Sequence, residues 1–486
     1  MITPLFILAL ILGYFIVLVS VSYFVIQEDS NEVFFKANRN SPWYLVAFGM
    51  VGASLSGVTF ISVPGWIEAS QFSYFQVVLG YLVGYFVVAY LLLPIYYKNN
   101  VTSIYEYLST RLGKSSHYAG AFFFFVSRVL GAAFRLFLVA IVLQEFIFDA
   151  LKVPFEVTVV ISILLIWIYT QKGGIKTIVF TDTLQTSLMI LAVLLSITYI
   201  NQALDWSFFD FIASDELSNF SNVFVTDSLL SRNHFLKSFI GGAFVTICMT
   251  GLDQDMMQKN LSCRNLKDAQ KNMVVFSIVL VIVTGLFMLL GALLYIYANQ
   301  HGISVPLVDG SPKTDLLFPE IALNGNLGIA VAVTFILGLI AAAYSSADSA
   351  LTSLTTSFCV DFLHIEQLEA DKQKSLRKKI HIGMSLLLIL VVILFKYILD
   401  RNVIDGLLTV AGYTYGPLLG LFAFGIFTDY QIKDRLLWPV LLIIIFFISI
   451  LGSLDARFLG GYQLGYELLP LNGFLTFLGL VLIRRK

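Results

Sequence analysis

Long apolar segments recur along the whole chain and restrict the folds that it can adopt. Each approaches the roughly 20 residues that an α-helix needs to cross a bilayer. Because backbone polar groups cannot be left unpaired in lipid, such segments must be helical. The predicted segments run at 5–26, 43–66, 73–96, 117–150, 154–171, 177–201, 235–257, 272–298, 326–361, 380–399, 403–427, 436–453 and 469–483. The sequence thus predicts an all-α integral membrane protein of about 13 transmembrane helices.

Composition agrees with a lipid environment. Of the 486 residues 58% are hydrophobic and 13% are charged, about half the charged share of a soluble domain. The connections between segments are too short for a further soluble domain, so we expect a single transmembrane domain over 1–486. The net charge of −1 argues against a nucleic-acid partner, and nothing indicates a required protein partner.

The basic residues predict the orientation. With the N-terminus outside, the inner connections carry about three times as many lysines and arginines as the outer ones. The inner set includes Lys259 and the basic end 484–486, which places the C-terminus in the cytoplasm. We therefore expect a multi-pass protein of a bacterial-type inner membrane, with two longer outer connections at about 202–234 and 299–325.

Two segments combine glycines with small hydroxyl residues. The second contains GMVGASLSGVTFISVPG (49–65) and the seventh contains IGGAFVTICMTGLDQD (240–255). Such residues permit local unwinding, which frees backbone carbonyls as cation ligands, although they also serve close helix packing. Each of the two begins a run of five segments. Interrupted helices at matching places in two halves predict an inverted-repeat transporter with its site near the middle of the membrane.

Ionisable residues inside predicted spans are costly and are usually functional. Arg128 and Arg135 lie in the fourth segment, Asp182 in the sixth and Asp348 in the ninth. Asp348 sits in LIAAAYSSADSALTSLTTS (339–357), where Ser345 and Ser349 share its helical face. This density of hydroxyl groups favours a sodium site over packing alone. No nucleophile motif, phosphate-binding loop or metal-ligand cluster is present, so we do not expect an enzyme.

Several longer motifs resemble the sodium/solute symporter family, which includes bacterial galactose, proline and sialic acid carriers. GGIKTIVFTDTLQ (173–185) is similar to the sixth-helix signature of that family, and GLDQDMMQKNLSCRNLKDAQKNM (251–273) to the end of its broken seventh helix. AAAYSSADSALTSLTTSF (341–358) resembles its sodium-binding ninth helix, and AGYTYGPLLGLFAFGIFT (411–428) its eleventh. The resemblance covers about 43–430.

The resemblance implies a LeuT-type core of two inverted five-helix repeats over 43–427. One extra helix (5–26) precedes this core and two helices (436–483) follow it. It also implies a main sodium site. The ligands would be the backbone carbonyls of Gly52, Leu55 and Ala342 with the hydroxyls of Ser345 and Ser346. A candidate second cation site would use Asp182, Ser345, Asp348 and Ser349, unless Asp348 instead holds a proton.

In similar carriers the solute lies between the broken helices. The matching positions are Ser54, Ser56, Thr59, Val78, Tyr81, Thr246 and Thr409, with Tyr74 and Met249 as outer and inner gates. Val78 stands where the galactose carrier has an acidic residue, which argues against a hexose. Either Arg135 or Arg128 matches the arginine that holds a substrate carboxylate in a sialic acid carrier. We expect Arg135 to hold an anionic or zwitterionic solute, although an internal structural partner is an equal alternative.

These observations predict a sodium-coupled symporter that imports a small polar organic solute by alternating access. One sodium ion is expected at the main site, and a second is expected if the site at Asp182 and Asp348 binds a cation. The alternatives are a proton-coupled carrier of a neutral solute and a transporter-like membrane sensor.

Overall fold

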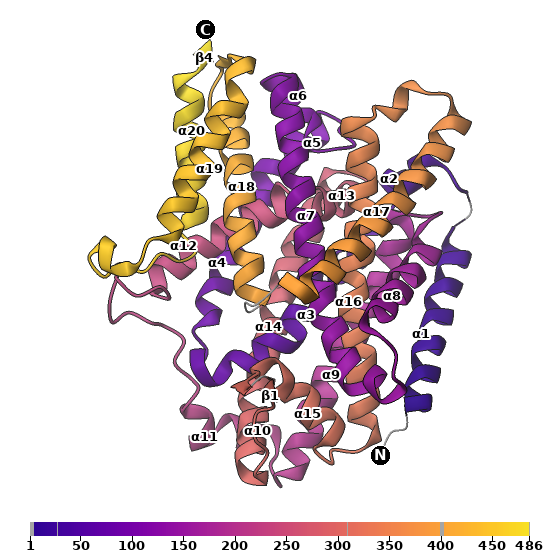
Figure 1. The fold of residues 1–486 in the computed structure, drawn as a ribbon, viewed down its shortest axis with the longest axis vertical. Helices are drawn as coiled ribbons and strands as arrows, with labels where there is room; N and C mark the ends of the chain where they lie inside the picture. The colour runs from indigo at the N-terminus through magenta and orange to yellow at the C-terminus, as the bar shows by residue number, and fades with distance from the viewer. Residues whose placement is uncertain (1–3, 27, 309, 399–402, 486) are drawn as a thin grey trace.

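The computed structural model describes residues 4–26, 28–308, 310–398 and 403–485 and is almost entirely helical. Most helices run along the long axis of the molecule, and the two termini lie at opposite ends of it (Figure 1). The long helices are α1 (Pro4–Val25), α3 (Trp43–Ser70), α4 (Tyr74–Val87), α7 (Lys114–Leu143), α8 (Phe155–Thr170), α9 (Ile175–Ala203), α12 (Phe235–Thr246), α14 (Leu266–His301), α16 (Ile329–Ser357), α17 (Ala370–Ile398), α18 (Val403–Phe427), α19 (Leu437–Ser453) and α20 (Leu468–Leu482).

Ten helices among the described residues are long and apolar enough to cross a membrane. The bent pair formed by residues Phe235–Gly251 and Gln254–Leu261 adds an eleventh. Helices α8 and α20 are apolar but shorter. The all-helical membrane class is confirmed, whereas the count of about 13 spans stays a prediction.

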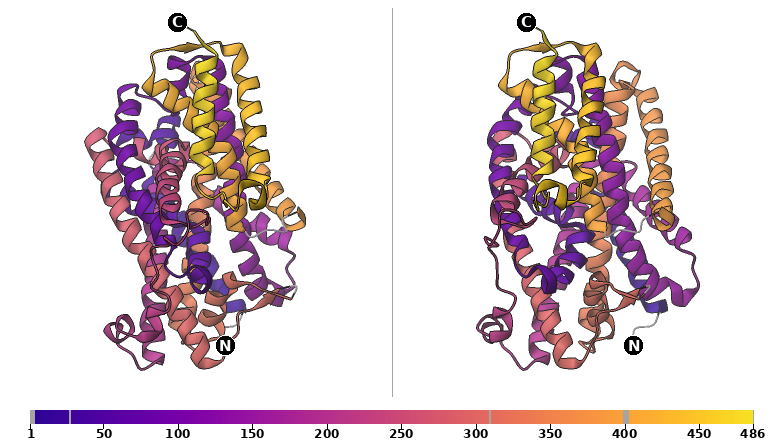
Figure 2. Two further views of the ribbon diagram at one scale, coloured as in Figure 1. Left: turned by 90° about the vertical axis from the view of Figure 1, so that its left-hand side faces the viewer. Right: turned by 60° about the vertical axis from the view of Figure 1, so that its left-hand side comes forward.

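Four long helices form the centre of the molecule. Helix α16 packs along α9, and α14 packs along α3. Around this centre, α12 lies against α4, and α18 lies against both α7 and α20. The views in Figure 2 show α19 and α20 beside α18 at one side of the bundle, while α1 packs on α8 and α9 at another.

Short elements gather at the end of the molecule where the N-terminus lies (Figure 1). They are α10 (Phe208–Ile212), α11 (Asp215–Ser218), α15 (Leu317–Asn324) and the two-stranded pair β1 (Leu307–Val308) and β2 (Ser311–Pro312). Figure 1 thus places the two longest connections together at one end, as the sequence predicted.

Other short elements lie between the long helices or near the C-terminus. They are α2 (Asn31–Lys36), α5 (Leu93–Lys98), α6 (Glu106–Arg111), α13 (Gln254–Leu261) and the pair β3 (Gln431–Ile432) and β4 (Arg484–Arg485). Helix α13 begins at a strong cap, because the Asp253 carboxylate accepts the N–H groups of Asp255 at 2.9 Å and Met256 at 3.3 Å. That cap also marks a bend of 64° in the seventh segment.

Candidate functional site

The second segment is broken in its middle. Within α3, Ser56 has φ 54° and ψ 175°, a left-handed conformation that non-glycine residues seldom adopt. Such a residue costs about 1–3 kcal/mol and persists only where its surroundings hold it. The regular helical dihedral angles of α3 are therefore interrupted between Leu55 and Gly57. The predicted interruption is confirmed, and its position falls on a serine.

Two glycines bring α3 unusually close to α9. A methyl group on Gly49 would lie 2.9 Å from the Cβ of Asp182, and one on Gly52 would overlap the hydroxyl of Thr186. The Gly52 N–H donates to Thr186 Oγ1 at 3.0 Å, and that hydroxyl donates to the Asp182 carbonyl at 2.7 Å. These glycines therefore serve close helix packing and also place the interrupted helix α3 beside the Asp182 carboxylate.

The hydroxyl-rich part of α16 lies in the buried centre of the molecule. Ser345 Oγ donates to Asp182 Oδ1 at 2.8 Å, which leaves its lone pairs free for another partner. Ser346 is 1% exposed, and its hydroxyl has no hydrogen-bond partner among the described residues. A buried hydroxyl without a partner is costly unless an ion or water binds it. The donor chemistry at this point therefore fits a sodium ion.

The other candidate cation ligands on α16 point to different neighbours. Asp348 Oδ2 accepts the Tyr169 hydroxyl at 2.7 Å, while its Oδ1 has no partner among the described residues. Ser349 donates instead to Asp255 of α13. Asp182 of α9 is completely buried. The three α16 side chains thus have three separate carboxyl or phenol partners.

The second helix break carries charged groups that sequence reasoning did not single out. After α12, the π-helical turn η5 (Ile247–Gly251) leads into the bend and into α13, all of whose residues are buried. The Asp255 carboxylate accepts a hydrogen bond from the Arg128 guanidinium of α7 as well as from Ser349. Asp253 accepts the hydroxyl of Tyr415 from α18. The two carboxylates at the start of α13 therefore bind side chains of three neighbouring helices, α7, α16 and α18.

Lys259 is the largest departure from the sequence-based expectation. It was counted with the basic residues of the inner connections, but it is 1% exposed within α13. Its ammonium group lies 2.7 Å from Asp182 Oδ2. An Asp followed by a Lys four residues later, directly after a glycine-rich break, is the sequence signal that could have indicated this role.

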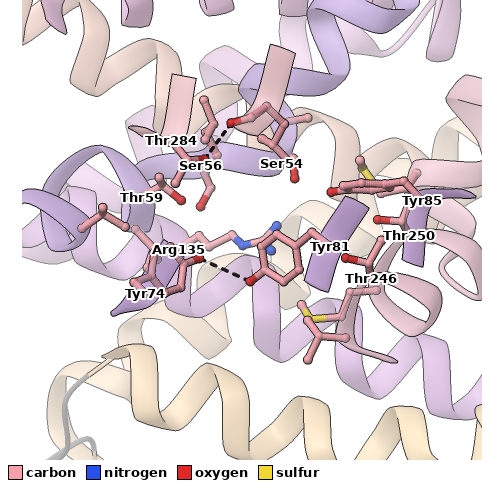
Figure 3. A pocket seen from close by; sticks show the side chains of 18 of the residues that line it. Ser54, Ser56, Thr59, Tyr74, Tyr81, Tyr85, Arg135, Thr246, Thr250 and Thr284 are labelled. Atoms are coloured by element: carbon pink, nitrogen blue, oxygen red, sulfur yellow. Dashed lines mark hydrogen bonds between the residues drawn. The ribbon is translucent and has the colours of Figure 1, made fainter. Parts of the chain in front are cut away.

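A cavity lies beside the break in α3 and continues between α3, α4, α7, α12 and α14 (Figure 3). Six of the predicted solute-binding residues line it, together with both predicted gate residues. They are Ser54, Ser56, Thr59, Tyr81, Arg135 and Thr246, with Tyr74 and Met249 as the gates. Tyr85, Thr250 and Thr284 add hydroxyl groups that were not predicted. The wall therefore combines many hydroxyl groups with few charges.

The two arginines of α7 differ in their partners. Arg128 is paired with Asp255, whereas Arg135 makes no ion pair or hydrogen bond among the described residues. Arg135 is 8% exposed, and Figure 3 shows its side chain extending into the cavity near Tyr81 and Tyr74. Those two hydroxyls lie 3.3 Å apart. Arg135 is thus the guanidinium that is free to bind a ligand.

Two predicted positions do not join this cavity. Val78 is fully buried and is not part of the wall. The side chain of Thr409 lies outside the described residues. Trp66 and Tyr466 line both this cavity and an adjoining depression.

Comparison with known proteins is consistent with this geometry. The sodium:solute symporter family model matches residues 34–438. The sodium/sialic acid symporter of Aliivibrio fischeri is 24% identical over 468 residues, covering 93% of this chain and 89% of that protein. The corresponding symporter of Proteus mirabilis is 24% identical over 430 residues, covering 86% and 84%. A solved sodium-coupled sialic acid symporter in a substrate-bound outward-open state has a TM-score of 0.82 at 21% identity, covering 98% and 97%.

Proposed function

This chain belongs to the sodium:solute symporter family, and from that premise we propose that it imports a small organic anion together with sodium. The fold is the LeuT-type membrane fold, and the protein is a multi-pass membrane transporter that uses sodium. We assign 43–427 to the transport core, with 5–26 and 436–483 as accessory helices.

The free guanidinium of Arg135 supports the choice of an anion. A buried arginine without a countercharge is unfavourable, and a carboxylate can satisfy two of its N–H groups at once. The hydroxyl groups around it suit a solute that itself carries several hydroxyls. A polyhydroxylated carboxylic acid fits both features. The relatives named for sialic acid make N-acetylneuraminate the first compound to test.

The sodium ion of the main site would bind where the break in α3 faces α16. We propose the carbonyls of Gly52, Leu55 and Ala342 and the hydroxyls of Ser345 and Ser346 as ligands. The unpartnered Ser346 hydroxyl is the observation that carries this assignment. Five neutral oxygens suit a hard monovalent ion that must leave again in every cycle.

Coupling follows if sodium favours the arrangement in which the solute cavity is complete. An ion that bridges α3 and α16 stabilises only those states in which the two helices are close. A tenfold sodium gradient supplies about 1.4 kcal/mol per ion. Tyr74 and Met249 would close the cavity on its two sides, and the end with the N-terminus would face outward.

Uptake by proteoliposomes tests the proposal. We expect radiolabelled N-acetylneuraminate, or another carboxylate found by a thermal-shift screen, to accumulate under an inward sodium gradient and not under a potassium or proton gradient. Arg135→Ala should weaken solute affinity by more than tenfold while sodium binding persists. Full affinity in that variant would contradict the role of Arg135, and equal uptake in potassium would contradict sodium coupling.

A further inference from the structure

Both oxygens of the Asp182 carboxylate, which a second cation would bind, already have a hydrogen-bond donor beside them. Each of its two carboxylate oxygens already has a close partner, Ser345 Oγ at 2.8 Å and Lys259 Nζ at 2.7 Å. Asp182 is fully buried, Lys259 is 1% exposed and Ser345 is 0% exposed, so water does not screen this arrangement. Asp182 is the carboxylate that was expected to help bind a second cation.

The Lys259 ammonium group supplies the positive charge that a second cation would have brought to Asp182. It carries one positive charge and lies at hydrogen-bond distance from the carboxylate. Unlike sodium, it is covalently attached to α13 and cannot be exchanged with the solution. We propose that Lys259 is a tethered cation that occupies Asp182 and limits this carrier to one sodium ion per transport cycle.

Charge balance supports a single sodium. The charged side chains around the α16 hydroxyls are Asp348 of α16 itself, the pair Asp182 and Lys259, and the pair Asp255 and Arg128, in which Arg128 offsets Asp255. Lys259 offsets Asp182, whereas the described hydrogen-bond partner of the Asp348 side chain is the neutral Tyr169 hydroxyl. With Asp348 ionised, one negative charge remains, and one sodium at Ser345 and Ser346 would balance it. A second sodium would leave a net positive charge in a buried region.

The attachment of Lys259 to α13 gives the ion pair a further consequence. Helix α13 follows the bend of the seventh segment, while Asp182 belongs to α9. A movement of α13 away from α9 would withdraw the ammonium from Asp182, whose Oδ1 orients the Ser345 hydroxyl. Lys259 is thus a positioning residue for the main sodium site as well as the occupant of the second one.

Direct counting of bound sodium tests this inference, which rests on the proposed function. Purified full-length protein in detergent is equilibrated with radioactive sodium, with choline keeping the ionic strength constant. We expect one sodium ion per protein in the wild type. Lys259→Met should expose the Asp182 carboxylate and double the number to two, and Lys259→Gln should do the same while retaining a hydrogen-bond donor.

Matched variants separate charge from shape. Lys259→Arg keeps the positive charge and should bind one sodium. The double variant D182N/K259M removes both charges and should also bind one. These readouts would not change if Lys259 had a purely structural role, because loss of packing does not create a second binding site.

Three results decide the matter. Two sodium ions in the wild type, or one in properly folded Lys259→Met and Lys259→Gln proteins, would overturn the tethered-cation proposal. No sodium binding in the wild type would instead contradict the proposed symport function. If both single variants fail to fold, the wild-type count of one or two still decides between the alternatives.

Discussion

The two helix breaks of this transporter are built from different chemistry. The break in α3 at Ser56 presents backbone and hydroxyl oxygens and no charged side chain. The break between α12 and α13 is followed within eight residues by Asp253, Asp255 and Lys259, each of which has a buried partner on another helix. The first break suits an ion that must bind and leave, whereas the charged groups after the second break bind side chains of neighbouring helices.

This difference indicates a division of roles. Neutral ligands hold a dehydrated sodium ion without trapping it, because no charged ligand in direct contact with the ion has to be separated from it on release. Buried ion pairs are costly to break when only one partner is removed. We therefore expect substitutions at the α3 break to alter sodium or solute binding, and substitutions at the α13 break to alter stability first.

The largest effect is expected from Asp255→Asn. This change leaves the buried Arg128 without its countercharge, and loss of one partner from a buried ion pair costs about 3–5 kcal/mol. Thermal unfolding of the purified protein should show a large loss of stability. The double variant R128M/D255L, which removes both charges, should recover most of that stability. Ser54→Ala at the first break is the control and should cost about 1 kcal/mol or less. Equal losses at both breaks would contradict the division of roles.

A smaller loss is expected from Tyr415→Phe. The Tyr415 hydroxyl donates to Asp253, and a hydrogen bond to a charged group contributes about 1.5–3 kcal/mol. The N–H groups of Asp255 and Met256 still hold Asp253, so the cap of α13 should survive. Thermal stability should fall while sodium affinity stays near the wild-type value. Tyr90→Phe, whose side chain is 60% exposed, should have no effect. A fall in sodium affinity together with thermal stability would contradict the division of roles between the two breaks.

Gly52→Ala tests the first break by adding a group to it, whereas the two changes at the second break remove an interaction. The added methyl group would overlap the Thr186 hydroxyl and lie 3.2 Å from its Cβ, which forces α3 away from α9. Overpacking of this kind costs about 1–3 kcal/mol, and we expect at least a tenfold loss of sodium affinity. Gly383→Ala on α17 is the control, since its methyl group would meet nothing within 4 Å. Unchanged sodium affinity in Gly52→Ala would show that the spacing of α3 and α9 does not build the site.

Much of the architecture could be predicted because it depends on local patterns. Apolar runs predicted the long helices, and glycines with hydroxyl residues predicted the interruption of the second and seventh segments. The sequence left two candidates for the arginine that has no internal partner and can bind the solute. Arg128 and Arg135 lie seven residues apart, and the distinction came from Asp255, which is 127 residues away from Arg128 in the chain.

The charged contacts of α13 could not be predicted in the same way. Lys259 and Asp182 are 77 residues apart, and nothing local distinguishes a buried lysine after a span from one in a connection. Val78 shows the converse limit. This position was matched through a family resemblance, but Val78 is fully buried and lies outside the cavity wall.

Sodium affinity of the Ser346→Ala protein tests the central assignment most directly. Sodium-dependent thermal stabilisation and radioactive sodium binding would be measured for the wild type, Ser346→Ala and Ser353→Ala. Ser353 lies on the same buried helix but donates to the Ala350 carbonyl at 3.1 Å. We predict that Ser346→Ala loses at least tenfold in sodium affinity while Ser353→Ala resembles the wild type. Wild-type sodium affinity in Ser346→Ala would contradict a sodium site between the α3 break and α16.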